Sequence, residues 1–406
     1  MDSFELDTEP IALAAVSGFR TGIASCGIKS AGPDVGVLYC EDPRGCGSAV
    51  FTRNEVAAAP VRVSRPRAAA GGLRAAVVNS GNANCCTGAR GDSDAREMSA
   101  IAARLLGTSE EQVLVASTGI IGRPMPMETV RRGVEAACAQ ALSDGNGDLA
   151  SAILTTDTRR KAASARGRIS GRPFRVAGIA KGAGMIAPDM ATMLAFVVTD
   201  ATVSRSCLGR VLALAASRTF NRVTVDGDTS TNDTLCLLSS CRAANPVIED
   251  ESSPAGSVFA AAVEAVCKAL AVAIAADGEG ATRLVEVRVS GAASPRDAEL
   301  AARAVAQSLL VKTAIHGADP NWGRILAAAG RSGARVDDSR ATVRLAGVRV
   351  FDAGRPAPSL PPDMRERLSR SPVLVELELG LGEGSAEMWT CDLSAKYVEI
   401  NAHYHT

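Results

Sequence analysis

The chain has 406 residues, which is long enough to bury a large core and to form two or more subdomains. Its 44 basic and 44 acidic residues give a formal net charge of zero, and it has no basic stripe with interleaved aromatic residues, so nucleic-acid binding is not favoured. The first ten residues are acidic and lack the basic and apolar segments of a signal peptide.

The longest apolar run, residues 258–276, is interrupted by Glu264 and Lys268. It therefore predicts an amphipathic helix and not a membrane span. The eleven cysteines are odd in number and include no CxxC pair, which indicates reduced thiols and does not favour zinc binding. We expect a cytoplasmic protein that has neither a membrane nor a nucleic acid as its partner.

The first part of the chain alternates short apolar runs with glycine-rich turns. Strands are predicted at residues 36–40, 48–51, 60–63, 73–79, 111–116 and 174–179, and helices at residues 92–106 and 129–142. The strand at 111–116 runs into STGIIG, where the backbone N–H groups of a Thr-Gly turn can point at one spot, as an oxyanion hole requires. Many strand–turn–helix joins look the same, so this motif is weak by itself. In TTDT, residues 155–158, the hydroxyls and the aspartate are also typical of a helix cap.

The stretch KGAGMIAPDMATMLAF, residues 181–196, joins a glycine-rich loop to an apolar run that predicts a buried strand. Thr192 stands at the junction, and a threonine hydroxyl becomes a nucleophile only if a base takes its proton. Two of the three histidines, His403 and His405, are among the last four residues, so the chain offers few such bases. A chain break before Thr192 would instead supply an α-amine, whose ordinary pKa is about 7.7–8.0. An isolated Ala-Thr pair is more often an ordinary strand start, so whether Thr192 is a nucleophile must be judged from the other motifs of the chain.

The second part of the chain predicts helices at residues 205–218, 258–276 and 296–309, strands at 284–290 and within 373–390, and a tail that begins as a strand. Residues 220–233 hold three aspartates, Asp226, Asp228 and Asp233, but not the closing glutamate of an EF-hand loop. This spacing favours turn and capping chemistry over a cation site. Glu279 lies between two glycines, where it is either a solvated turn residue or a carboxylate aimed at a ligand ammonium.

Eight motifs in one order carry a resemblance to a known family. They are SGNANCCTG, STGIIG, TTDT, KGAGMIAPDMATML, FNRVTVDGDTSTND, DGEGAT, GADPNWGRI and INAHYHT. The chain closely resembles the ornithine acetyltransferase family, also called glutamate N-acetyltransferases, from about residue 11 to its end. The resemblance implies an α+β fold, a four-layer α/β/β/α sandwich with mixed sheets. It also implies self-cleavage between Ala191 and Thr192 into an N-terminal chain, 1–191, and a C-terminal chain, 192–406, which assemble as a heterotetramer of two chains of each kind.

The resemblance further implies the reaction and the site. An acetyl group would pass from N2-acetyl-L-ornithine to L-glutamate through an acetyl-Thr192 intermediate, in cyclic arginine biosynthesis, with the freed Thr192 amine as the base. Thr118 and Gly119 match the family's oxyanion-hole pair. The substrate-binding positions carry over as Thr155, Lys181, Thr192, Glu279, Asn401 and Thr406. Lys181 suits the α-carboxylate of an acyl amino acid, and Glu279 suits a substrate ammonium. No metal or organic cofactor is implied, and acetyl-CoA stays open as a further donor.

Two other interpretations use the same residues. A self-cleaving amidase or aminopeptidase would release the acyl group from Thr192 to water, and a binding protein would carry an inert Thr192. Lys181, Glu279 and the tail favour an amino-acid acceptor and therefore the transferase. One departure from the family is His405, which stands where arginine is usual and concerns how the tail docks.

Overall fold

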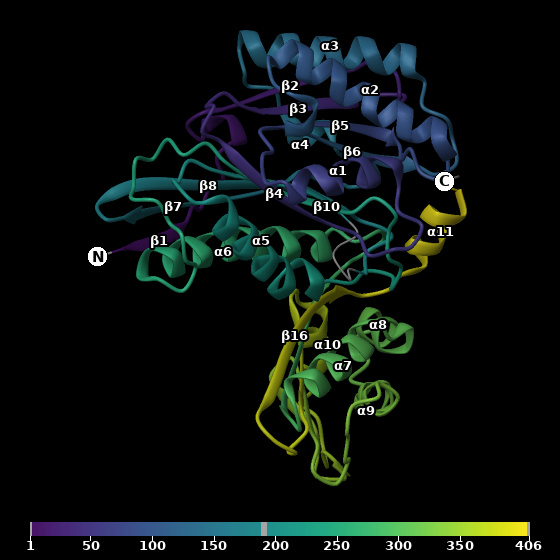
Figure 1. Cartoon of the computed structure of the whole chain (residues 1–406). Helices are drawn as coiled ribbons and strands as arrows, with labels where there is room; N and C mark the ends of the chain where they lie inside the picture. Colours follow the sequence, from purple (N-terminus) through teal and green to yellow (C-terminus); the bar gives the residue numbers. More distant parts are fainter. Residues whose placement is uncertain (1, 188–192, 404–406) are drawn as a thin grey trace.

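The computed structural model describes residues 2–187 and 193–403, so the predictions for Ala191, Thr192 and Thr406 lie outside the described residues. Most of the chain forms four layers, which are two helices, a four-stranded sheet, a six-stranded sheet and two further helices (Figure 1). Both sheets contain parallel and antiparallel pairs. This arrangement confirms the α/β/β/α sandwich with mixed sheets that the sequence predicts.

The four-stranded sheet lies between the outer helices and the second sheet. Its strands, in spatial order, are β2 (Phe19–Ala24), β3 (Val35–Cys40), β5 (Ala75–Asn82) and β6 (Val113–Ile120). Helices α2 (Gly88–Leu106) and α3 (Met127–Ser143) cover its outer face. On β5, Val77 belongs to the core under these helices and Val78 to the core between the two sheets. Both faces of the strand are buried, which explains its continuous apolar run.

The six-stranded sheet carries the segments on either side of the predicted cleavage bond. Its strands, in spatial order, are β1 (Ser3–Leu6), β7 (Lys161–Ile169), β8 (Arg172–Lys181), β9 (Leu194–Thr199), β10 (Thr234–Ser239) and β4 (Cys46–Phe51). Helices α5 (Arg205–Arg218) and α6 (Pro254–Ala276) cover its outer face. By length and composition alone α6 could cross a membrane. Its Val263, Val266 and Leu270 are instead buried in the core beneath this sheet, so α6 is a core helix.

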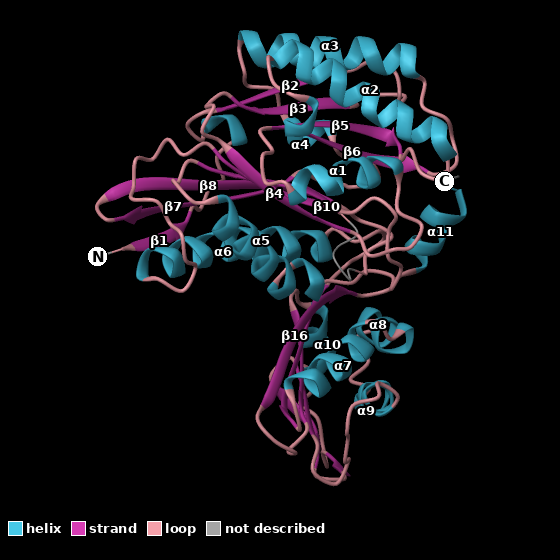
Figure 2. Cartoon of the chain, viewed as in Figure 1, coloured by secondary structure: helices cyan, strands magenta, loops and turns pink. Residues whose placement is uncertain are grey.

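The C-terminal part adds a smaller α/β unit, at the bottom of Figure 2, that the sequence did not separate from the rest. Its six-stranded sheet has the order β14-β13-β12-β15-β11-β16. The strands are β11 (Leu284–Ala292), β12 (Thr342–Leu345), β13 (Val348–Asp352), β14 (Arg355–Pro356), β15 (Val373–Glu378) and β16 (Gly384–Cys391). The helices are α7 (Pro295–Ala306), α8 (Leu309–His316), α9 (Trp322–Gly330) and α10 (Met364–Ser369). The unit has its own apolar core, on which Trp322 stacks against Phe351.

Two sequence-based predictions of strands are wrong. Residues 60–63 belong to helix α1 (Ala59–Ala69), because Pro60 lies in the first turn, where its fixed φ and missing N–H suit a helix start. The tail forms helix α11 (Ala395–His403), on which no residue is buried, so no apolar face could reveal its periodicity. The remaining short elements are α4 (Leu149–Ala152) and three 3-10 turns at Leu13–Ala15, Glu110–Gln112 and Phe220–Arg222.

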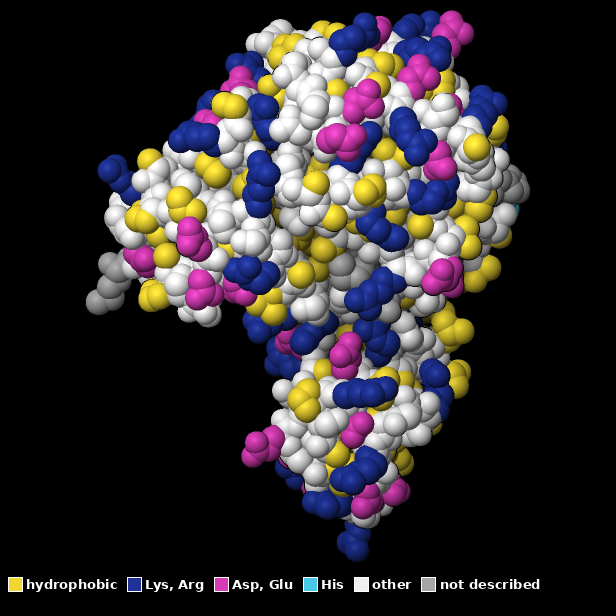
Figure 3. Space-filling model, in the orientation of Figure 1, with side chains coloured by type: hydrophobic (Ala, Val, Ile, Leu, Met, Phe, Trp, Pro, Cys, Tyr) yellow, Lys and Arg dark blue, Asp and Glu magenta, His cyan; other side chains and the backbone are white. Residues whose placement is uncertain are grey.

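Charges of both signs are interspersed over the face of the molecule in Figure 3, where no single-sign stripe appears. Among the described residues, no group of three or more His, Cys, Asp or Glu side chains is placed to hold a metal ion.

Candidate active site

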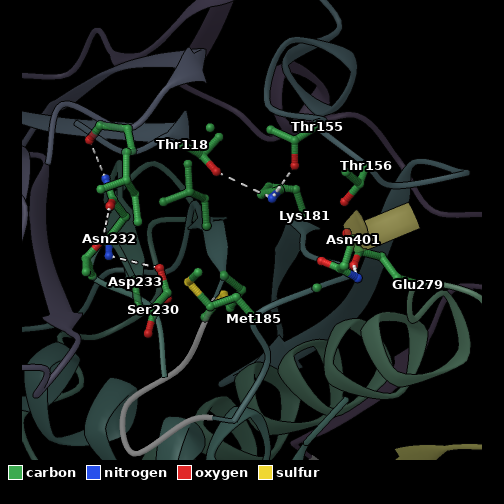
Figure 4. Close-up of a pocket in the computed structure, with 17 residues that line it drawn as sticks. Thr118, Thr155, Thr156, Lys181, Met185, Ser230, Asn232, Asp233, Glu279 and Asn401 are labelled. Atoms are coloured by element: carbon green, nitrogen blue, oxygen red, sulfur yellow. Dashed lines mark hydrogen bonds between the residues drawn. The ribbon is translucent and has the colours of Figure 1, made fainter. Parts of the chain in front are cut away.

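One pocket brings together every described residue that the sequence predicted for the site. It lies where strands of both sandwich sheets end, beside the loop after α6 and beside α11 (Figure 4). The predicted residues that line it are Thr118, Gly119, Thr155, Lys181, Glu279 and Asn401. Met193, which follows Thr192 in the chain, lines the same pocket. These positions are 283 residues apart at the extremes, from Thr118 to Asn401, so only the fold could assemble them.

Thr118 and Gly119 lie near the end of strand β6, at the edge of the pocket. Gly119 pairs with Gly81 of β5 and has a φ of +127°. A Cβ atom there would lie 2.4 Å from the Gly81 carbonyl carbon, so only glycine lets the two strand ends approach this closely. The Asn232 side chain clamps these ends, since its amide donates to the Ala83 carbonyl at 2.7 Å and to the Ser117 carbonyl at 2.9 Å. A rigid strand end that presents a hydroxyl and closely approaching backbone to a pocket is suited to hold an oxyanion.

Lys181 ends β8 with its side chain buried in the pocket. Its ammonium donates to the Thr155 hydroxyl at 2.7 Å and to the Thr118 hydroxyl at 3.4 Å, as the dashed lines in Figure 4 show. Thr156 also lines the pocket, but the contact with Lys181 belongs to Thr155, the threonine chosen from the sequence. Burial lowers the pKa of Lys181, and the carboxylate of Asp157, 3.8 Å away, opposes this shift. A buried cation at the wall of a pocket favours a ligand carboxylate.

Glu279 supplies a carboxylate to the same pocket from the loop after α6. Its backbone N–H donates to the Ala183 carbonyl at 2.9 Å, and its Oε2 accepts a hydrogen bond of 2.8 Å from the Asn401 amide. Gly184 lies against this carboxylate, because a Cβ atom at that position would come within 2.4 Å of Oε2. The carboxylate is buried and held in place, so of the two roles expected for Glu279 the structure excludes that of a solvated turn residue.

Comparison with known proteins assigns the chain to a family. The ArgJ family model matches residues 20–406. The chain belongs to the ArgJ family. It is 48% identical over 395 residues to the arginine biosynthesis bifunctional protein ArgJ of Geobacter sulfurreducens, which covers 96% of this chain and 100% of that protein. It is 47% identical over 398 residues to ArgJ of Symbiobacterium thermophilum, covering 97% and 98%.

A solved structure agrees with this assignment. The crystal structure of ArgJ from Bacillus halodurans matches with a TM-score of 0.50 and 40% identity, covering 52% of this chain and 98% of that chain. Membership of the ArgJ family confirms the resemblance found in the sequence and, with it, the class of enzyme, an acetyltransferase. The roles of the individual site residues stay predictions, as do those of Ala191, Thr192 and Thr406, which the structure does not describe.

Asp233 is a pocket residue whose role the sequence did not predict. It precedes β10, whose Thr234 is paired with Leu194 of β9, so Asp233 lies beside Met193. Burial raises the pKa of Asp233 well above its ordinary value. Its Oδ2 has no hydrogen-bond partner among the residues described in the structure. The sequence showed only a cluster of three aspartates, and nothing in it indicated that one of them is buried.

Asp226 behaves as the sequence suggested. Its carboxylate accepts the backbone N–H groups of Met185 at 2.6 Å and Ile186 at 2.8 Å. It therefore ties the turn at 226–228 to the glycine-rich loop after Lys181, which is turn chemistry as expected. By contrast, the TTDT motif does not cap a helix. Asp157 accepts hydrogen bonds from the backbone N–H groups of Thr155 at 3.2 Å and Gly182 at 2.6 Å, so it supports the pocket.

Proposed function

We propose that this protein transfers an acetyl group from N2-acetyl-L-ornithine to L-glutamate, in cyclic arginine biosynthesis. The observation that carries the proposal is one pocket with a cation, Lys181, and a carboxylate, Glu279, both buried and held by hydrogen bonds. An amino acid with an ammonium on its side chain carries the complementary charges. Lys181 would bind the α-carboxylate, and Glu279 with Asn401 would bind the ornithine ammonium.

The chemistry would proceed through Thr192 in two half-reactions. The Thr192 hydroxyl attacks the acetyl carbonyl, its proton passes to the Thr192 α-amine, and the amine then protonates the departing ornithine nitrogen. The negative oxygen of the tetrahedral intermediate would be stabilised by Thr118 and Gly119 at the end of β6. Glutamate enters the emptied site, and its amine takes the acetyl group from Thr192. Ping-pong kinetics are therefore expected.

The fold supports self-cleavage at Ala191–Thr192 as part of the proposal. Strand β8 ends at Lys181 and its antiparallel neighbour β9 begins at Leu194, so in the sequence the bond falls between two strands that are paired in one sheet. Two fragments divided there would share this sheet and its core, and both would line the pocket. The Bacillus halodurans ArgJ chain is matched along 98% of its length yet covers 52% of this chain, as a product of cleavage near the middle would.

Several further properties belong to the same proposal. We expect a heterotetramer of two N-terminal and two C-terminal chains, located in the cytoplasm and working without a metal or organic cofactor. The related proteins are named bifunctional, which supports acetyl-CoA as a second acetyl donor to glutamate.

The decisive experiment offers labelled acetylornithine with glutamate, and labelled acetyl-CoA with glutamate in a separate reaction. Labelled N-acetylglutamate from acetylornithine is the expected product, whereas labelled acetate as the main product would establish an amidase instead. Mass spectrometry of the purified protein should find two fragments that meet at Ala191 and Thr192. Thr192→Ala should remain one inactive chain of 41.6 kDa, and an uncut wild-type chain with full activity would refute the mechanism.

A further inference from the structure

A network of four buried charged side chains begins at the pocket residue Lys181. Lys181 is 3.8 Å from Asp157, the Asp157 carboxylate accepts a hydrogen bond of 2.6 Å from Lys161, and Lys161 also donates to Asp277 at 2.5 Å. The exposed fractions of these side chains lie between 0% and 10%. Two lysines and two aspartates balance in charge, which a buried network requires to be stable.

Within this network, Asp157 makes the contacts that hold the residues of the pocket. Besides the Lys161 ammonium, its carboxylate accepts the backbone N–H groups of Thr155, whose hydroxyl contacts Lys181, and of Gly182, which follows Lys181 in the chain. Burial opposes the ionisation of Asp157, but the charges of Lys181 and Lys161 outweigh it and lower its pKa to about 2. The carboxylate is therefore ionised at neutral pH.

At the other end of the network, Asp277 lies close in sequence to Glu279, the second charged group of the pocket. Asp277 directly follows α6 and lies two residues before Glu279, and its carboxylate also accepts hydrogen bonds from the Thr158 backbone and hydroxyl. Lys161 thus connects the segment that follows Thr155 with the loop that carries Glu279.

Lys181 needs a nearby negative charge to remain a cation. Burial lowers its pKa, the positive charge of Lys161 lowers it further, and Asp157, Glu279 and Asp233 raise it. Lys29 adds one more positive charge in the neighbourhood. Among the three carboxylates, Asp157 makes the strongest contribution to the pKa of Lys181, and burial raises the pKa of Asp233 itself well above its ordinary value.

We infer that Asp157 is a positioning residue that keeps Lys181 protonated and oriented for the α-carboxylate of the substrate, with Lys161 and Asp277 as its charge balance. The inference rests on the proposed function, since it takes Lys181 as the carboxylate-binding group. It extends that function by naming the group that keeps the buried Lys181 side chain charged.

The first test replaces the charge without changing the shape. Asp157→Asn removes the carboxylate, so the pKa of Lys181 falls further and the lysine loses its proton as the pH rises. We expect the KM for N2-acetylornithine to increase about tenfold or more, with a much smaller change in kcat. The increase in KM should be smallest at about pH 6 and largest at about pH 9, because a lower pH restores the proton on Lys181.

The second test restores the charge balance. In Asp157→Asn with Lys161→Met, the positive charge next to Lys181 is also removed, so the KM should return towards the wild-type value. A merely structural role for Asp157 predicts that the double variant is at least as impaired as the single one. Asp200→Asn is the matched control, because this buried carboxylate accepts the Arg175 backbone N–H at the opposite end of β8.

The outcomes separate this inference from the proposed function. A wild-type enzyme that transfers no acetyl group to glutamate refutes the function. An active wild type combined with a wild-type KM in Asp157→Asn, or a double variant no better than the single one, overturns the inference alone. Should Asp157→Asn fail to fold, Asp157→Glu keeps the charge, and its KM should be raised equally at all pH values. A KM that rises with pH in Asp157→Glu and not in the wild type would overturn the inference too.

Discussion

Gly184→Ala should damage substrate binding with little effect on folding. A Cβ atom at this position would lie 2.4 Å from Oε2, 2.5 Å from Cδ and 2.6 Å from Oε1 of Glu279. Ordinary contact begins at 3.4 Å, so the carboxylate must withdraw by about 1 Å. That movement would break the hydrogen bond of 2.8 Å with Asn401 and shift the charge away from the substrate ammonium.

The size of the effect follows from the group that is displaced. A hydrogen bond to a charged group contributes about 1.5–3 kcal/mol, and about 1.4 kcal/mol corresponds to a tenfold change. The KM for acetylornithine should therefore increase about 10- to 100-fold. Gly184 does not have a positive φ, so alanine causes no left-handed backbone strain there, and the atoms that its Cβ meets are the movable end of one side chain. The melting temperature should change by only a few degrees.

Steady-state kinetics at saturating glutamate and thermal unfolding measure the two effects separately. Gly330→Ala is the matched control, since a Cβ atom there meets nothing within 4 Å and the residue ends α9, in the C-terminal unit. The control should match the wild type in KM. An unchanged KM in Gly184→Ala would refute the placement of Glu279 at the substrate ammonium. A large loss of stability would show instead that the loop cannot absorb the shift.

Three further substitutions probe other parts of the pocket. Lys181→Ala should raise the KM for acetylornithine about a hundredfold, as the loss of a buried charge pair implies, and unfolding of the variant would instead indicate a structural role. Asn401→Ala removes one donor to Glu279 and should raise the same KM about fivefold without changing the melting temperature, because Asn401 is exposed on α11. Asp233→Asn concerns stability. The pKa of Asp233 is raised in the folded protein, so its stabilising effect is complete below the ordinary aspartate pKa and is lost as the pH rises towards the folded value. As the pH rises through this range, the wild type should lose stability that Asp233→Asn does not lose, so the melting temperature of the variant should increase relative to that of the wild type. A difference in melting temperature that is the same at all pH values would contradict the burial argument.

Local sequence patterns predicted the helices and strands whose own residues have a clear apolar spacing or a strong strand preference. The apolar spacing of residues 258–276 indicated α6, and the short valine-rich runs indicated β3, β5 and β9. Strand β7, with the sequence KAASARGRI, was not predicted, because alanine, glycine and arginine have weak preferences for strands. It forms because it is paired on both sides, by β1 and by β8. Neither partner is apparent without the fold.

The residues proposed to carry the chemistry were chosen from motifs, because a glycine loop, a Thr-Gly turn or a lone lysine has the same chemical capability in any fold. The amino-acid sequence alone thus determined the family, the four-layer fold and the groups expected to react. Only the tertiary structure decided how those groups are charged and held. Lys161 and Asp277 are 116 residues apart, and the burial that lowers the pKa of Lys181 and raises that of Asp233 arises from several elements packed together. Desolvation belongs to an environment and not to a residue, so no local pattern could reveal it.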